Sequence, residues 1–375
     1  MSTLHAAAPA HPHAHRRERA KSRDPFFDNA KMLLVTLVVV GHSWTLLPDV
    51  STSSPVYVFL YTFHVPAFVL VTGYLSRRFT FTRANLRKLV TTIVVPYLVF
   101  ETLLALFRTV VGHENFGVLY ISPHWPMWYL TVLFLWRLAT PLFTRMRPGT
   151  ALALAVAICL IGGLNTVDAL DLPRAAGLLP FFVAGLFISR EQLDLLARPR
   201  VRVVAAALLT LTFFVSLFVA GSFSKEWLYW RTGYPDLGVP FWLGASIRLG
   251  GLVVAGLLTL SALSLIPRSQ RWFTPLGAAS LVVYLFHGFF VKGAEYAGVG
   301  SWSERDPVNA FLAVTLAAVG ISLLLSATPI SRRLNALVDP ISTLNAEPGG
   351  VLEPGHHRTQ NIERVALAPR DHTRL

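Results

Sequence analysis

The chain has 375 residues, of which 53% are hydrophobic and 14% charged, and its formal net charge is +13. Soluble domains normally contain about 25% charged residues, so this composition excludes an ordinary soluble protein. The basic residues fall in short segments between apolar runs, which is typical of a membrane protein that obeys the positive-inside rule rather than of a nucleic-acid-binding protein. Cys159 is the only cysteine, which excludes an intramolecular disulfide and a cysteine-rich metal site.

The apolar runs predict an all-α, polytopic membrane protein, because each is long enough to cross a bilayer as a helix. Residues 1–24 form a polar tail without the apolar core of a cleaved signal peptide. Residues 25–328 form the membrane domain, and residues 329–375, rich in Pro, Gly, His and Arg, are expected to be a disordered tail. We expect ten transmembrane helices, at residues 32–48, 55–75, 89–111, 125–143, 150–166, 175–189, 201–220, 245–266, 276–294 and 307–328.

The connections between these helices alternate in charge. Basic residues cluster before the first helix and after each even-numbered one, as between Arg77 and Lys88. The alternate connections, such as Asp49 to Ser54, are poorer in lysine and arginine. Because basic loops stay in the cytoplasm, both termini are predicted to be cytoplasmic and the chain to lie in the plasma membrane.

The first predicted helix carries two ionisable residues on one face. Lys31 and His42 are eleven residues apart, which is three turns plus about 20°, and roughly 16 Å along the axis. A lysine at a helix end is often only an anchor whose amine reaches the headgroups. An ionisable residue at the depth of His42 indicates a functional site.

Further polar residues lie inside later helices. His64, close to Pro66 in the second helix, lies at a depth within about 5 Å of that of His42. Glu101 lies in the middle of the third helix, where a carboxylate costs roughly 2.5 to 3.5 kcal/mol unless it is protonated, paired or hydrated. Arg137 in the fourth helix and His287 in the ninth are equally consistent with structural and site roles.

The longest external connection, residues 221–244, is rich in aromatic residues, including Trp230. These side chains are typical of an aromatic belt at the outer headgroups. They also suit a platform on which a sugar ring stacks.

The sequence contains no zinc spacing, P-loop, Rossmann glycine pattern or nucleophile elbow in a plausible context. A histidine can instead act as the general base that a hydroxyl nucleophile needs at neutral pH. Acyl-coenzyme A fits the spacing of Lys31 and His42, since its phosphates and its thioester lie at opposite ends of a flexible arm.

Several motifs resemble those of the acyltransferase-3 family of integral membrane acyltransferases. The segment from Asp28 to His42 resembles the family's basic-residue-x10-His signature, and the segments from Phe63 to Phe68 and from Thr72 to Leu75 are similar to its second-span motif. The segments from Trp128 to Leu130 and from Tyr284 to Gly288 are also similar. Within the family, the chain resembles the fucose-4-O-acetylase-like acetyltransferases.

This resemblance implies an enzyme that moves an acyl group, most often acetyl, from cytoplasmic acyl-CoA to a hydroxyl of a glycan or related acceptor. The composition, rich in Ala, Leu and Arg, is compatible with a bacterial protein, and no metal is expected. His42 is then the general base or a transient acyl carrier, and Lys31 a contact of the CoA phosphates. Lys31 departs from the arginine of many members, so it loses the bidentate contact. We assign His64 and Glu101 to orienting His42, Arg77, Arg78 and Arg137 to the phosphates, and Trp128, His287 and Trp230 to the acceptor.

Three other functions are consistent with parts of the pattern. A transporter or flippase would also have many spans and ionisable groups within the membrane. Another membrane O-acyltransferase fold would also use a histidine at this depth. A membrane scaffold would leave the buried histidine and glutamate without a reason.

Overall fold

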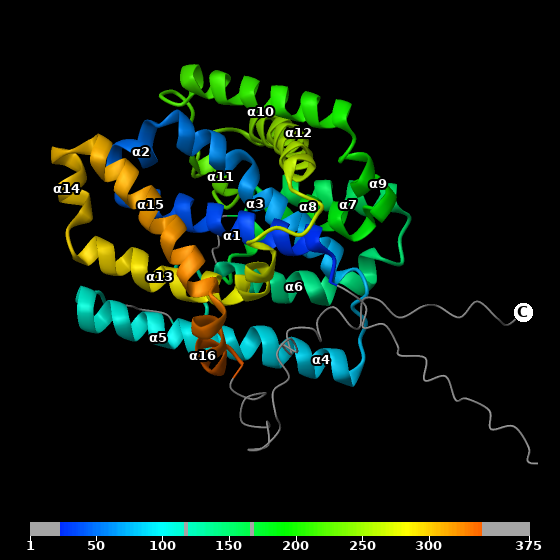
Figure 1. The fold of residues 1–375 in the computed structure, drawn as a ribbon. Coiled ribbons are helices and arrows are strands. Elements are labelled where there is room, and N and C mark those ends of the chain that lie inside the picture. Colours follow the sequence, from blue (N-terminus) through cyan, green and yellow to red (C-terminus); the bar gives the residue numbers. More distant parts are fainter. Residues whose placement is uncertain (1–22, 116–118, 166–168, 340–375) are drawn as a thin grey trace, which may run out of the picture.

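The computed structural model describes residues 23–115, 119–165 and 169–339, and the regular structure in these ranges is entirely helical (Figure 1). This confirms the all-α class. The predicted tails lie mostly outside the described residues.

Seven helical segments in the described ranges are long and apolar enough to cross a membrane, and three further apolar helices are shorter. The shorter helices have 15 or 16 residues, about 24 Å, against the roughly 30 Å of a bilayer core. The ten segments match the ten predicted ones in order, but only seven reach spanning length. The long segments are α1 (Pro25–Ser43) with η1 (Trp44–Leu46), α3 (Pro55–Ser76), α4 (Arg83–Leu89) with η2 (Val90–Val94) and α5 (Val95–Gly112), α10 (Pro199–Val219), α12 (Phe241–Leu265), η3 (Thr274–Ala279) with α13 (Ser280–Tyr296), and α15 (Pro307–Ser326); the short ones are α6 (Trp128–Phe143), α7 (Pro148–Gly162) and α8 (Leu172–Phe187).

The first helix begins at Pro25 rather than at residue 32. Asp24 caps it by accepting a hydrogen bond from the backbone N–H of Phe26 at 3.0 Å, and proline is favoured in a first turn because it has no N–H to leave unpaired. Hydropathy alone missed this start, because the first turns contain polar residues. Lys31 and His42 therefore lie on one continuous helix.

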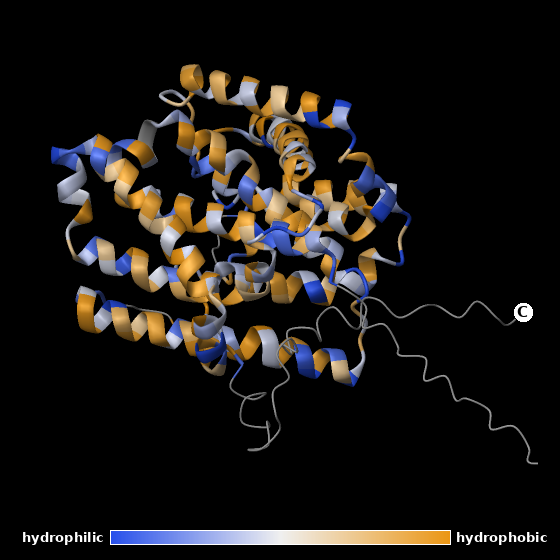
Figure 2. Ribbon diagram, in the orientation of Figure 1, coloured by the Kyte–Doolittle hydropathy of each residue, from blue (hydrophilic) through white to orange (hydrophobic). Residues whose placement is uncertain are grey.

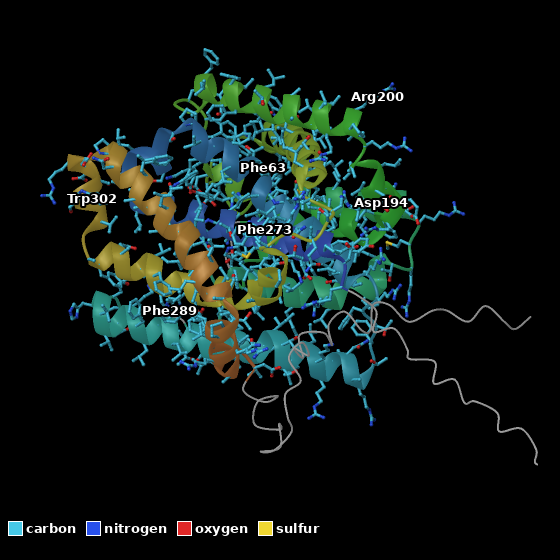
Figure 3. All side chains as sticks on the ribbon, in the orientation of Figure 1. Phe63, Asp194, Arg200, Phe273, Phe289 and Trp302 are labelled. Carbon is cyan, nitrogen blue, oxygen red and sulfur yellow. The ribbon has the colours of Figure 1, made fainter. Side chains whose placement is uncertain are left out.

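Short helices lie at the two ends of the bundle (Figure 1). At one end are α2 (Pro48–Ser53) and α14 (Val299–Arg305), and at the other is α9 (Arg190–Leu195). Figure 2 shows the hydrophilic segments at these ends and hydrophobic helices between them. Figure 3 likewise places Asp194 and Arg200 at one end and Trp302 at the other. This distribution suits a bundle with its ends in water and its middle in lipid.

One helix extends into the predicted C-terminal tail. α16 (Thr328–Val338) packs against α13, α15 and α5. Its apolar residues Ile330, Leu334 and Val338 recur every four positions and share one face. Pro329 stands in its first turn, where proline is compatible with a helix.

The central helix is α1, which packs against α3, α13, α15 and η3. Its buried Asn29 donates to the carbonyl oxygens of Pro267 (2.8 Å) and Ser269 (3.1 Å) and accepts from Thr274 Oγ1 (2.6 Å). These bonds attach the start of α1 to the connection between α12 and α13. The helix that carries His42 is thereby fixed against the helix that carries His287.

Close backbone packing joins α3 to α8. A Cβ atom added at Gly73 would lie 2.1 Å from the carbonyl oxygen of Phe182, and one at Gly185 would lie 2.1 Å from that of Leu70. Only glycine permits this approach. It fixes the position of α3, on which His64 lies.

An ionic contact joins the C-terminal ends of α5 and α13. Glu114, just after α5, accepts hydrogen bonds from Arg108 and from the hydroxyl of Tyr296, and Lys292 lies 3.3 Å away. Burial alone would raise the pKa of Glu114, but the hydrogen bonds from Arg108 and Tyr296 and the charge of Lys292 lower it to about 2. Glu114 is therefore a carboxylate that holds the two helices together.

The aromatic connection 221–244 folds against the bundle, although both sequence interpretations placed its rings at the surface. It contains α11 (Glu226–Tyr229), and Trp230 and Tyr234 are 4% and 1% exposed. The indole of Trp230 packs against Phe181, and its backbone packs against Gly177. Trp242, at the start of α12, is 69% exposed and fits the aromatic belt. Trp230 is thus a packing residue in this structure rather than an open acceptor contact.

Candidate active site

Two histidines from distant parts of the chain meet inside the bundle. His42 Nδ1 lies 2.8 Å from His287 Nε2, and the two rings stack at 5.1 Å. His42 is near the end of α1 and His287 is in the middle of α13. Both residues are buried. The direct partner of His42 is therefore His287, which the sequence analysis assigned to the acceptor.

The hydrogen bonds determine where the protons of this pair reside. His287 Nδ1 lies 2.6 Å from the carbonyl oxygen of Tyr284, and a carbonyl can only accept, so Nδ1 carries a proton. In a neutral imidazole the other nitrogen then has a lone pair, so His287 Nε2 accepts from His42 Nδ1. The remaining nitrogen, His42 Nε2, consequently has the free lone pair of a base. It has no hydrogen-bond partner among the described residues and is not completely enclosed.

A tryptophan from the connection between α5 and α6 covers this pair. The ring of Trp125 lies 4.5 Å from that of His42 and 6.3 Å from that of His287. Tyr284 holds both His287 and Trp125 in place. Its carbonyl accepts a hydrogen bond from His287, and its hydroxyl donates to the carbonyl of Pro126, the residue after Trp125, at 2.6 Å. The imidazole of His42 therefore has two aromatic neighbours, the indole of Trp125 at 4.5 Å and the imidazole of His287 at 5.1 Å.

Glu101 holds the same connection from the other side. Its carboxylate accepts the backbone N–H of His124 at 2.9 and 3.1 Å and the ring Nδ1–H of His124 at 2.6 Å. Glu101 is completely buried, and this pairing supplies the hydrogen bonds that a buried carboxylate needs. It contacts His124 rather than His42, so any effect on His42 passes through the segment that carries Trp125.

His64 is completely buried on α3, next to Tyr61. Its Nδ1 donates to the carbonyl of Leu60 at 2.8 Å, which leaves a lone pair on Nε2. Nε2 has no hydrogen-bond partner among the described residues. Its role in orienting His42 stays a prediction.

Several cations gather at the end of the bundle that contains α4 and α9. Lys31 pairs with Asp28 at 2.8 Å. Arg77 stacks on Tyr74 at 3.8 Å, and Arg78, next in the chain, has a buried Nη1 without a partner among the described residues. Lys31 is therefore already neutralised in this structure.

Lys88 and Arg137 are two neighbouring cations of this region, because the charge of one acts on the other. Helix α6 packs against η2 directly after Lys88, and the charges of Lys88 and Arg137 act on each other. Arg137 Nε is buried without a hydrogen-bond partner, and neither cation has a carboxylate partner in the described ranges. Two neighbouring cations without a carboxylate partner in the described ranges favour a bound anion.

A buried ion pair lies near His42 at the start of α8. Arg174 lies 2.9 Å from Asp171, donates to the carbonyl of Tyr229 at 3.2 Å and stacks on Trp128 at 4.3 Å. Its positive charge acts on His42 as well. Trp128 is only 9% exposed, so its assignment to the acceptor stays a prediction with little open surface to support it.

A cavity of about 200 Å³ lies behind the histidine pair, among α1, α13, α14 and α15. Its lining is apolar apart from Ser43 and His287. Apolar surroundings strengthen a hydrogen bond by keeping water from competing for it. Among the residues that the structure describes, no group of three or more His, Cys, Asp and Glu is placed to hold a metal ion.

Sequence reasoning missed Lys88, His124, Trp125 and Arg174 as site residues. Lys88 was counted only as part of a basic loop, and the other three stand in connections or at a helix start, where hydropathy carries no signal of burial. Pro126 next to Trp125 was the available signal that the helix predicted from residue 125 starts later, at Trp128.

Comparison with known proteins identifies the family of this chain. A part of the chain is 42% identical over 59 residues to the nodulation protein NolL of Mesorhizobium japonicum, which covers 15% of this chain and 16% of that protein. No solved structure matches the chain. The acyltransferase domain of the acyltransferase-3 family matches residues 24–327, which is most of the chain and includes all ten apolar helices. The chain therefore belongs to the acyltransferase-3 family of membrane acyltransferases.

Proposed function

We propose that this acyltransferase moves an acyl group, in the simplest case acetyl, from cytoplasmic acyl-CoA to a hydroxyl of a cell-surface glycan or related acceptor. The observation that carries the proposal is the unpartnered Nε2 of His42, made a base by the hydrogen bond from Nδ1 to His287. The fucose-4-O-acetylase-like subgroup and a bacterial plasma membrane are part of the same proposal.

The proposed reaction is a direct acyl transfer. His42 Nε2 takes the proton of the acceptor hydroxyl, and the hydroxyl oxygen attacks the thioester carbonyl carbon at the same time. The tetrahedral intermediate then breaks its carbon–sulfur bond, and His42 returns the proton to the departing CoA thiolate. His287 stabilises the charged imidazole because it accepts from Nδ1. The same Nε2 would form the bond if His42 were instead a transient acyl carrier.

The donor phosphates are assigned to the cations at the proposed inner end of the bundle. Lys88 and Arg137 lack carboxylate partners in the described ranges, so an anion there removes their mutual repulsion. Arg77 and Arg78 extend this positive region. Lys31 contributes only if a phosphate competes with Asp28.

Replacing either Lys88 or Arg137 with glutamine is expected to raise the apparent KM for acetyl-CoA about tenfold or more, because each removes a charge from the phosphate site. The measurement is transfer of label from radiolabelled acetyl-CoA by purified protein to an envelope extract. Arg83→Gln is the matched control, since Arg83 is exposed on the same helix as Lys88.

If Lys88→Gln and Arg137→Gln had the same KM for acetyl-CoA as Arg83→Gln, the proposed phosphate site would be contradicted. A wild-type protein that transfers no label but moves a solute across vesicles would favour the transporter instead. The first result tests the phosphate site and the second tests acyl transfer, so the failure of one leaves the other testable.

For topology, we propose ten crossings with both termini in the cytoplasm, the short α6, α7 and α8 included. Ser222→Cys is expected to react with an impermeant maleimide in intact cells, and Arg147→Cys only after permeabilisation, since both sites are exposed but in connections of opposite charge type. Native Cys159 is buried and should stay unlabelled throughout. Labelling of both introduced cysteines from the same side would refute the arrangement.

A further inference from the structure

Trp125 is the tryptophan whose ring lies next to the base, and it is assigned neither to the acyl donor nor to the acceptor. Its ring lies 4.5 Å from that of His42. Whereas His42 is buried, Trp125 is partly exposed. Trp125 is therefore a large apolar ring that contacts the base and is partly accessible to a ligand.

The backbone on both sides of Trp125 is held by hydrogen bonds. His124, directly before it, binds the buried carboxylate of Glu101 through backbone and ring. Pro126, directly after it, accepts from the hydroxyl of Tyr284 at 2.6 Å. Since Glu101 is on α5 and Tyr284 on α13, two helices position one indole. A site held on rigid elements in this way keeps its geometry when a ligand binds.

The other tryptophans considered for the acceptor are either less accessible than Trp125 or out of contact with the base. Trp128 is 9% exposed and carries the guanidinium of Arg174 on its ring, and Trp230 is 4% exposed. Trp242 is open, but it makes no ring contact with the histidine pair. Trp125 alone among these four combines partial exposure with contact to the base.

We propose that Trp125 is the platform on which a pyranose ring of the acceptor stacks, so that the acceptor is a carbohydrate and one of its hydroxyls reaches His42 Nε2. A pyranose presents an apolar face of C–H groups with hydroxyls around its rim. Stacking that face on an indole places the rim toward the neighbouring imidazole. This inference rests on the proposed function for the reaction but not for the binding of the sugar.

The test is saturation-transfer NMR on the full chain in detergent, with a panel of methyl hexopyranosides and methyl 6-deoxyhexopyranosides as probes. Irradiation in the aromatic region avoids the detergent signals. The expected result is transfer to the C–H face of at least one sugar, and an apparent dissociation constant about tenfold higher in Trp125→Leu. Trp125→Phe, which keeps a ring, should retain most of the binding.

Three further measurements distinguish sugar stacking on Trp125 from a purely structural role of its ring. Trp242→Leu should leave sugar binding unchanged, because that indole is exposed away from the histidine pair. Trp125→Leu should keep its affinity for acetyl-CoA, which also shows that it folds. Glu101→Gln should weaken sugar binding in the same direction as Trp125→Leu, because it loosens the backbone before the indole.

The inference is overturned if no sugar of the panel receives saturation in the wild-type chain, or if Trp125→Leu binds as well as the wild type. Equal losses in Trp125→Leu and Trp242→Leu would also overturn it. None of these readings involves acyl transfer. A chain that binds a sugar through Trp125 but transfers no acyl group would contradict the proposed reaction and leave the platform standing.

Discussion

Replacing His42 with glutamine is expected to lower the rate of acyl transfer by about 10²- to 10⁴-fold, the usual contribution of a general base. Glutamine keeps a polar side chain of similar length but cannot take a proton from a hydroxyl. The measurement is transfer of label from acetyl-CoA at saturating donor and acceptor. His113→Gln is the matched control, since His113 is an exposed histidine after α5.

The variant should bind acetyl-CoA with nearly unchanged affinity, since the proposed phosphate contacts lie at the far end of the donor. A normal rate in His42→Gln would remove His42 from the reaction. A rate that falls together with the amount of folded protein would show only a packing role. The separation of rate from donor affinity therefore decides between catalysis and packing.

Replacing His287 is expected to give the second-largest loss, again about 10²- to 10⁴-fold. His287 Nε2 accepts from His42 Nδ1, so it keeps the proton on Nδ1 and the lone pair on Nε2. His287→Gln can present an amide N–H to Nδ1 instead, which favours the tautomer with the proton on Nε2 and removes the base. In serine proteases, a change of the orienting group that favours the wrong tautomer has an effect of this size.

The tautomer itself is measurable by nitrogen NMR of labelled histidine. The wild-type chain should show His42 protonated at Nδ1, and His287→Gln should not. The double variant of His42→Gln and His287→Gln should be no slower than His42→Gln alone, because both changes remove one function. Additive losses would show that His287 acts independently of His42, and an unchanged tautomer would contradict its positioning role.

The sequence was most informative about local properties. Hydropathy and residue periodicity depend on neighbours within a few turns, so they identified the helical membrane class and the order of the apolar segments. Lys31 and His42 lie on one helix as their spacing predicted. The boundaries of the short helices were predicted less well: α6 begins at Trp128 rather than at residue 125, and α7 ends at Gly162 rather than at residue 166.

The partners of these residues depended on packing between distant segments. His42 and His287 are 245 residues apart, and Glu101 faces His124 rather than a histidine of a neighbouring span. Trp230 is in a connection that was predicted to be external, yet it is buried because that connection folds back against α8. Pattern along a chain contains no information about which faces of two remote helices meet.

The sequence by itself determined that this protein is a helical membrane protein with a histidine base candidate on its first helix, because both properties follow from residues close together in the chain. Only the tertiary structure decided which nitrogen of that histidine is free, which cations lack a counter-ion in the described ranges and which tryptophan lies beside the base. Those features arise where α1, α5, α6 and α13 come together. The packing of these helices depends on contacts between residues far apart in the chain, so no short stretch of sequence predicts it.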